Sequence, residues 1–297
     1  MAVKALSQHH STGYRIKNVR VRRASQCPLP LGGGRGMGWK EGDRHPAQTW
    51  ASMPQDDCLA EELPIALAYN GVSHAVMMAT PTDLEDFALG FSLAEGILGT
   101  PAELYSVEVT GHGPKGIELN LHIHGARMSA LKQNQRTLAG PSGCGLCGKT
   151  SLEHALRPLP RVTTRPLPKA EGIQHALTQL KHHQHLQGLT GASHAAAWCT
   201  PDGRIQHLRE DVGRHNALDK LIGALHHSGS QTDTSTGFLL MSSRASYELV
   251  AKAAQINLGT LVAVSGATAL AAEQAEQTGL NLIGFARDGR QVIYHAS

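Results

Sequence analysis

The sequence has few aromatic residues, little net charge and no long apolar run. Aromatic residues make up 4% of the 297 positions, and 27 basic against 24 acidic residues leave a net charge of +3. Few aromatics provide little surface for base stacking, and a near balance of charge argues against nucleic-acid binding. No apolar run is long enough to span a bilayer. We therefore expect neither a nucleic-acid partner nor a membrane-embedded protein.

The sequence also lacks a secretory signature and a disulfide pattern. The first residues are basic, without an apolar core or a small-residue cleavage site. The cysteine count is odd, and the residues are scattered: Cys27, Cys58, Cys144, Cys147 and Cys199. A long chain with this cysteine usage is typical of a reducing compartment. We expect a cytoplasmic protein.

What is present is a glycine-rich loop that carries two thiols. Cys144 and Cys147 lie in the run Gly143–Gly148, where glycine disfavours both helix and strand. Four interpretations remain open: incidental loop thiols, half of a zinc site, a redox pair, or a nucleophile that handles sulfur. A second C-x-x-C for zinc is missing. Lys149 and the start of a following helix would favour a thiolate, as sulfur chemistry requires.

The chain divides into four predicted segments. Residues 1–55 show no sustained period and are predicted to be a disordered or loosely packed tail. Residues 56–140 form a small α+β subdomain, residues 141–168 a mobile cysteine loop and proline-rich linker, and residues 169–297 the larger subdomain. The two thiols would thus lie beside the junction of two subdomains, a usual place for chemistry.

The predicted elements of the small subdomain are a hairpin, a helix and a second hairpin. Strand Leu63–Tyr69 turns at Asn70–Gly71, and a helix follows Thr82 or Asp83 as its N-cap. We interpret Glu95, late in this helix, as a surface carboxylate. Two further strands are predicted at Tyr105–Val109 and Ile117–Ile123.

The larger subdomain is predicted to alternate strands and helices, which favours a parallel sheet covered by helices. It begins with a helix near 169–185, followed by a strand of small residues that ends at Cys199. The strands expected later are 204–208, 238–242, 260–265, 280–285 and 292–294. Three more helices are expected here: one after the polar segment with Leu218, Leu221, Ile222 and Leu225 on one side, one over 243–256 and one over 268–278. A short helix over 149–156 is expected earlier, directly after the cysteine loop.

Three polar segments could line a site. In Arg209–Lys220, the side chains of Glu210, Asp211, Arg214, His215 and Asn216 form either a capping and salt-bridge cluster or, as we favour, a pocket wall. Ser243–Ser246 starts a helix and suits an anion, or simply caps the helix. Arg287 and Arg290 flank a turn and suit phosphates and purines, or lie in solvent on an ordinary hairpin.

Taken in order, these segments resemble the formate dehydrogenase accessory protein family of FdhD-type sulfurtransferases. The resemblance covers roughly residues 61–295, and a set of motifs in the family's order is far more specific than any one motif. The matching pieces are Thr80–Pro81 with the helix Glu85–Gly96, Cys144–Lys149, Thr190–Gly191 with His194–Ala197, Glu210–Lys220, Ser243–Leu249 and Gly284–Arg287.

The resemblance implies a sulfur carrier. Such proteins take persulfide sulfur from a cysteine desulfurase and pass it to the molybdenum of bis(molybdopterin guanine dinucleotide), a cofactor that formate dehydrogenase needs in sulfurated form. Cys144 would carry the persulfide, Cys147 would assist, and a homodimer is implied. The guanine dinucleotide end of this substrate would lie against Phe285, Ala286, Arg287, Asp288, Gly289 and Arg290.

The resemblance also implies an α/β fold, in which a cytidine-deaminase-like larger subdomain with a mixed sheet joins the smaller α+β subdomain. The catalytic zinc of true deaminases is not expected. Ala196 stands where the catalytic Glu would be, and the C-x-x-C precedes His194. Two other functions stay open: a zinc-dependent deaminase relative that uses Cys144, Cys147 and a His, and a non-catalytic chaperone of formate dehydrogenase.

Overall fold

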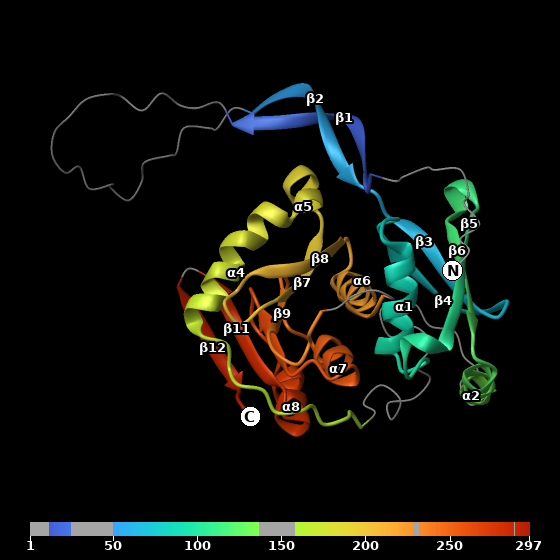
Figure 1. The fold of residues 1–297 in the computed structure, drawn as a ribbon. Helices are drawn as coiled ribbons and strands as arrows, with labels where there is room; N and C mark the ends of the chain where they lie inside the picture. Colours follow the sequence, from blue (N-terminus) through green and yellow to red (C-terminus); the bar gives the residue numbers. More distant parts are fainter. Residues whose placement is uncertain (1–11, 25–49, 137–157, 228–231, 288) are drawn as a thin grey trace.

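The computed structural model describes residues 12–24, 50–136, 158–227, 232–287 and 289–297 (Figure 1). Cys144, Cys147, Asp288 and the helix expected over 149–156 lie outside these ranges. The predictions made for them therefore remain predictions.

A mixed six-stranded sheet forms the centre of the larger part, with the order β12-β11-β10-β9-β7-β8. The three central strands β9, β10 and β11 run parallel, whereas β7 and β12 pair antiparallel with β9 and β11. This confirms the predicted parallel pairing of the strands after residue 238 and the mixed sheet that the resemblance implied. The strands are β7 (His194–Cys199), β8 (Ile205–Asp211), β9 (Phe238–Met241), β10 (Thr260–Ala263), β11 (Asn281–Arg287) and β12 (Arg290–His295).

Helices cover both faces of this sheet. Helix α4 (Ala170–His183) lies on one face, and α6 (Arg214–His226), α7 (Tyr247–Gln255) and α8 (Ala269–Thr278) lie on the other (Figure 1). Successive residues of a strand point to opposite faces. Accordingly Ala195 and Ala197 of β7 join the α4 core, whereas Ala196 and Trp198 join the core on the opposite side.

The smaller part is a four-stranded sheet with the order β4-β3-β6-β5, packed on helix α1 (Leu84–Ala94). Both predicted hairpins are present, and β3 and β6 pair in parallel between them. The remaining elements are β3 (Leu63–Tyr69), β4 (Val72–Ala79), η1 (Pro101–Glu103), β5 (Leu104–Gly111), η2 (Gly113–Lys115), β6 (Ile117–Ile123) and α2 (Gly125–Arg136).

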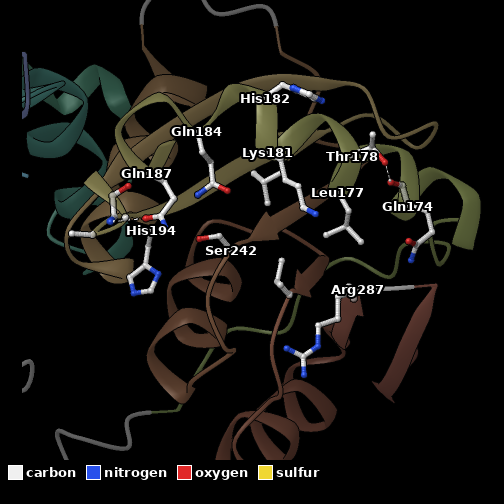
Figure 2. A pocket seen from close by; sticks show the side chains of 16 residues that line it. Gln174, Leu177, Thr178, Lys181, His182, Gln184, Gln187, His194, Ser242 and Arg287 are labelled. Atoms are coloured by element: carbon white, nitrogen blue, oxygen red, sulfur yellow. Dashed lines mark hydrogen bonds between the residues drawn. The ribbon is translucent and has the colours of Figure 1, made fainter. Parts of the chain in front are cut away.

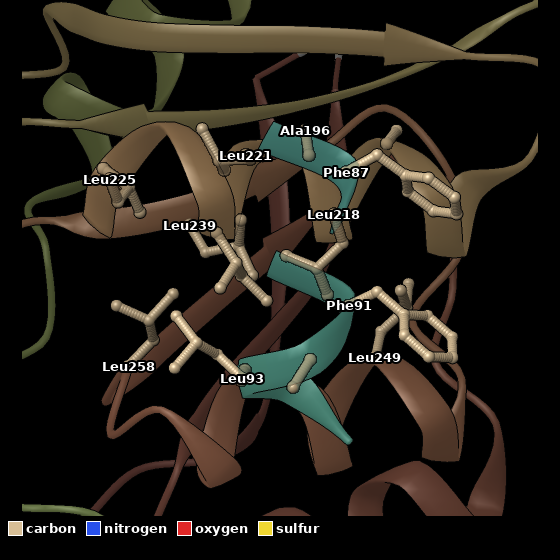
Figure 3. Close-up of a cluster of buried hydrophobic side chains, with 14 of the residues drawn as sticks. Phe87, Phe91, Leu93, Ala196, Leu218, Leu221, Leu225, Leu239, Leu249 and Leu258 are labelled. Atoms are coloured by element: carbon tan, nitrogen blue, oxygen red, sulfur yellow. The ribbon is translucent and has the colours of Figure 1, made fainter. Parts of the chain in front are cut away.

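Helices α1 and α6 join the two parts in one continuous core. A Cβ at Gly90 of α1 would overlap the carbonyl oxygen of Asp219, and a Cβ at Gly223 of α6 would overlap the carbonyl oxygen of Asp86. The two glycines therefore let the helix backbones touch. Around them Phe87 and Leu218 pack together with Leu239, in the cluster drawn in Figure 3.

Several boundaries differ from the sequence expectations. The expected tail 1–55 contains β1 (Tyr14–Ala24) and most of β2 (Trp50–Ala60), which pair as an antiparallel ribbon that extends from the body (Figure 1). Many described ribbon side chains, such as Ile16, are exposed. A ribbon with no core to cover needs no apolar alternation, which explains why the period was absent.

Two helices also differ from the expectations. Helix α2 was not predicted, because its sequence lacks a clear apolar stripe. The single helix expected over 169–185 ends at His183, and a second helix, α5 (His185–Thr190), follows it. Asp83 is the N-cap of α1 as expected, but with a positive φ of 51° and no side-chain cap. Its carboxylate instead lies 3.4 Å from Arg209 Nε.

We predict that Gly90→Ala and Gly223→Ala each lower the free energy of unfolding by about 3 kcal/mol or more, because the added methyl must push two helix backbones apart. Urea denaturation followed by circular dichroism measures this. Gly188→Ala in α5 is the matched control, since nothing lies within 4 Å of its Cβ position. It should be neutral or stabilising by up to about 1 kcal/mol. Equal stability of all three variants would contradict the close helix contact.

Candidate functional site

The carboxyl ends of β9, β10 and β11 meet at one edge of the large sheet, where ligands commonly bind in α/β folds. A cavity of about 760 Å³ opens there beside α4. Figure 2 shows Lys181 of α4 and Arg287 of β11 on opposite walls of this cavity. Gln187, His194 and Ser242 belong to the same lining. The volume is in the range of sites for small molecules and cofactors.

The segment expected to hold the nucleotide lies partly in this cavity. Ala286 and Arg287 line it, whereas Phe285 packs on the other side, against Gly266. The guanidinium groups of Arg287 and Arg290 lie 5.7 and 5.1 Å from the centre of the Phe285 ring. Both guanidinium groups thus make cation–π contacts with the same aromatic ring.

Phe285 holds an unusual backbone conformation. Its φ is +48°, and the pairing of β11 with β12 shifts register between Gly284 and Arg287. A bulky residue rarely adopts positive φ, and such strain concentrates at binding sites. The Phe285 amide donates a hydrogen bond to Ser265 O at 3.0 Å, which holds the bulge against the loop after β10. Ala286 and Arg287, which line the cavity, follow this strained residue directly.

His194 is the first residue of β7 and lies at the cavity wall. Burial lowers the pKa of His194, and the positive charges of Arg214 and His215 lower it further. Its ring therefore favours the neutral form. The neighbouring Ala195 amide donates to Ser242 Oγ at 2.8 Å, so the ends of β7 and β9 are fixed relative to each other.

The polar segment Arg209–Lys220 divides into two groups. Asp211, Asn216 and Lys220 are buried and bind the chain around Thr80. Lys220 Nζ lies 2.7 Å from Asp211 Oδ2 and donates to Thr80 O at 2.9 Å, and Asn216 donates to Met78 O at 2.8 Å. For these residues the pocket-wall interpretation is wrong, and the salt-bridge and capping interpretation is right. They tie the small part to the start of α6.

The second group faces the edge of the sheet. Glu210, at the end of β8 rather than in a loop, accepts hydrogen bonds from the Leu186 and Gln187 amides at 2.8 Å each and so holds α5 at the cavity rim. His215 Nε2 lies 2.6 Å from Glu248 of α7. Arg214 is half-buried beside them, and burial together with Arg244 lowers its pKa.

Glu95 is not the isolated surface carboxylate that the sequence suggested. Lys252 Nζ donates to Glu95 Oε1 at 2.9 Å and to Asp219 Oδ1 at 2.8 Å. Burial raises the pKa of the Asp219 carboxyl to about 6, against the lowering effect of Lys252. No local signal predicts this network, because Lys252 lies 157 residues after Glu95 in the sequence, on the amphipathic helix α7.

Within the described ranges, no three His, Cys, Asp or Glu side chains are placed to share a metal ion. In the same ranges, no helix combines the length and apolar character needed to cross a membrane. Cys199 is buried, which raises the pKa of its thiol and makes it unreactive. Cys58 is half-buried in β2.

The comparison with protein families covers both parts of the structure. The model of the FdhD/NarQ family matches residues 60–297, which include the cavity, the polar segment and the Phe285 bulge. The chain belongs to the FdhD/NarQ family.

Curated relatives of this FdhD/NarQ protein are similar to it in sequence along most of their length. A protein from Cupriavidus necator named sulfur carrier protein FdhD is 52% identical over 82% of this chain and 83% of its own. Proteins of the same name from Variovorax paradoxus and Bordetella petrii are 50% and 47% identical, over 94% and 81% of this chain and 95% and 85% of theirs.

A crystal structure of a protein described as a formate dehydrogenase accessory protein, from Desulfotalea psychrophila, has a similar fold. It superposes with a TM-score of 0.63 and 20% identity, over 94% of this chain and 97% of its own. At this identity the likeness concerns the fold, and it supports the mixed α/β architecture that the sequence predicts.

We predict that Asp211→Asn lowers the free energy of unfolding by about 3–5 kcal/mol, because it leaves the Lys220 ammonium buried without a charged partner. Chemical denaturation measures the loss. The double variant Asp211→Asn with Lys220→Met should recover part of it. Glu85→Gln, an exposed change on α1, is the control and should stay within about 0.5 kcal/mol of the parent. A small effect of Asp211→Asn would contradict the structural role.

Proposed function

We propose that this FdhD/NarQ protein is a sulfur carrier that delivers sulfur to the molybdenum of bis(molybdopterin guanine dinucleotide) for formate dehydrogenase. The observation that carries the proposal is the set of relatives named sulfur carrier protein FdhD, which are about half identical over most of the chain. The cavity with Arg287 at the edge of the sheet gives this substrate a place to bind.

Cys144 is the sulfur carrier in this proposal. Its thiolate attacks the outer sulfur of a persulfide on a cysteine desulfurase, the S–S bond of that persulfide breaks, and the desulfurase cysteine leaves as a thiolate. The sulfur then forms the outer atom of a Cys144 persulfide. The glycines of the run Gly143–Gly148 permit many backbone conformations, which suits a group that must meet two partners.

Delivery of the sulfur as sulfide requires two electrons. Cys147 supplies them when its thiolate attacks Sγ of Cys144, because the Cys144–Cys147 disulfide forms as the outer sulfur leaves toward molybdenum. Cellular thiols then reduce the disulfide in a reducing cytoplasm. Both cysteines thus have a role, with Cys144 as the carrier and Cys147 as the assisting thiol.

The guanine dinucleotide end of the substrate binds at Phe285–Arg290. Arg287 and Arg290 present guanidinium groups that match phosphate oxygens, and the Phe285 ring holds these two groups together. The other partners in this proposal are a cysteine desulfurase, formate dehydrogenase and a second copy of the chain.

We predict that incubation with a cysteine desulfurase and cysteine adds the mass of one sulfur atom to Cys144, and that Cys144→Ala abolishes this. Peptide mass spectrometry without reductant measures the added sulfur. In cells, Cys144→Ala should eliminate formate dehydrogenase activity while that enzyme still accumulates, because the cofactor stays unsulfurated. Cys58→Ala, outside the loop, is the control and should retain both.

Formate dehydrogenase activity that survives Cys144→Ala would instead indicate a non-catalytic chaperone. About one tightly held zinc per chain, lost in the Cys144→Ser variant, would indicate the deaminase-like alternative. Either result would contradict sulfur transfer through Cys144.

We predict that Arg287→Ala and Arg290→Ala each weaken binding of guanine nucleotides by about tenfold, because each removes a charged donor to phosphate. Isothermal titration calorimetry with GDP measures the affinity, and the persulfide on Cys144 should still form. Arg204→Ala, at the start of β8 and at the opposite edge of the sheet, is the charge-matched control. Unchanged affinity for GDP in both arginine variants would contradict the assignment of the nucleotide-binding site to Phe285–Arg290.

A further inference from the structure

Two helices begin side by side at the edge of the sheet that holds the cavity. β8 and β9 both pair antiparallel with β7, so they run in the same direction and end at the same edge. Helix α6 starts after β8 and helix α7 starts after β9, and His215 of α6 contacts Glu248 of α7. The N-caps of these helices, Gly213 and Ser246, give no side-chain cap. Uncapped N–H groups at a helix start favour an anion.

Three buried polar atoms at these helix starts make no hydrogen bond to the described residues: Ser246 Oγ, Arg214 Nε and His215 Nε2, of which His215 Nε2 still lies in an ion pair with Glu248. The Ser246 side chain is buried, with 8% of the residue exposed, and its Oγ makes no hydrogen bond. The Nε atom of Arg214, at the first position of α6, is also buried and unbonded, whereas the residue as a whole is half-buried. Native structures leave few buried donors unpaired, and each such atom calls for a missing partner. As the N-cap of α7, Ser246 has its hydroxyl next to the free N–H groups of that helix.

The charges around these atoms are positive on balance. Arg214 and Arg244 lie close enough for Arg244 to lower the pKa of Arg214, after the larger effect of burial. Within the described ranges, neither arginine forms a salt bridge. The charge of Glu248 acts on Arg214, and Glu248 also lies 2.6 Å from His215 Nε2 in an ion pair. Asp211, behind the helix start, is paired with Lys220. His194 and His215 complete the surroundings.

We propose that Arg214, Arg244 and Ser246, with the starts of α6 and α7, bind a diphosphate group. Two guanidinium groups and two helix starts supply more positive charge than the Glu248 carboxylate neutralises. A bound diphosphate would also give Ser246 Oγ and Arg214 Nε the hydrogen bonds that they lack. This seat uses other residues than the Phe285–Arg290 segment, which follows β11, and β10 lies between β11 and β9 in the sheet. The two sites are neighbours, because the Ala245 amide donates to Gly266 O and Phe285 packs against Gly266.

The substrate in the proposed function carries two guanine dinucleotide groups and therefore two diphosphates. One would lie at Arg287 and Arg290, and the other at Arg214 and Arg244. This assignment of the ligand rests on the proposed function, but the anion seat itself does not. His194 of the cavity wall lies beside the Arg214 and Arg244 seat, since β7 starts between the ends of β8 and β9.

Calorimetric titration of the full chain with inorganic pyrophosphate tests the seat. The measurement uses the Arg287→Ala, Arg290→Ala background, so that the other arginines do not contribute. Arg244→Gln, an exposed change, should weaken pyrophosphate binding by about tenfold. Arg204→Gln, the same charge change at the opposite edge of the sheet, should leave it within about twofold.

Ser246→Asp separates binding from folding. Its carboxylate caps α7 and occupies the place of the anion, so the melting temperature should be equal or higher while pyrophosphate binding is lost. Absence of pyrophosphate binding in the background protein, or equal affinity with Arg244→Gln and Arg204→Gln, would overturn the seat. Arg244→Gln should still acquire sulfur on Cys144. A parent protein that acquires no sulfur but binds pyrophosphate through Arg244 would overturn sulfur transfer and leave the seat standing.

Discussion

The buried ion pair between Lys220 and Asp211 holds the two parts of this protein in one arrangement. Both side chains are inaccessible to solvent, and their remaining hydrogen-bonding capacity is used by the backbone of Thr80 and by Asn216. A buried pair is costly unless it is satisfied in this way. Because Thr80 belongs to the small part and Lys220 to α6, the pair fixes where α6 begins. Everything at the edge of the sheet depends on that position.

The edge of the sheet gathers the groups that can meet a substrate. The strands that end there bring His194, Ser242 and Arg287 to one cavity, and the helices that begin there bring Arg214 and Arg244 beside it. Parallel strands followed by helices always place carboxyl ends and helix starts together. The gathering of helix starts at this edge is therefore a consequence of topology, to which the chain adds Arg214 and Arg244, neither of which forms a salt bridge with a residue that the structure describes.

Much of the fold was predictable because the relevant signals are local. The Asn70–Gly71 turn, the apolar stripe of α1 and the repeated strand–helix pattern after residue 238 each depend on neighbouring residues, and each prediction is confirmed. The β1–β2 ribbon was not predictable, since its strands pair across 25 intervening residues and face no core. The network of Glu95, Asp219 and Lys252 also depends on contacts between three separate helices.

The sequence by itself determined the family, the order of most strands and helices after residue 61 and the residues that could react or bind, because motifs and periodicity are properties of neighbouring positions. Only the tertiary structure decided the role of each polar residue in Arg209–Lys220. Asp211 and Lys220 turn inward to each other, while Arg214 and His215 turn to the edge of the sheet. Burial and pairing depend on the elements that fold against a side chain, and those elements are distant in the sequence.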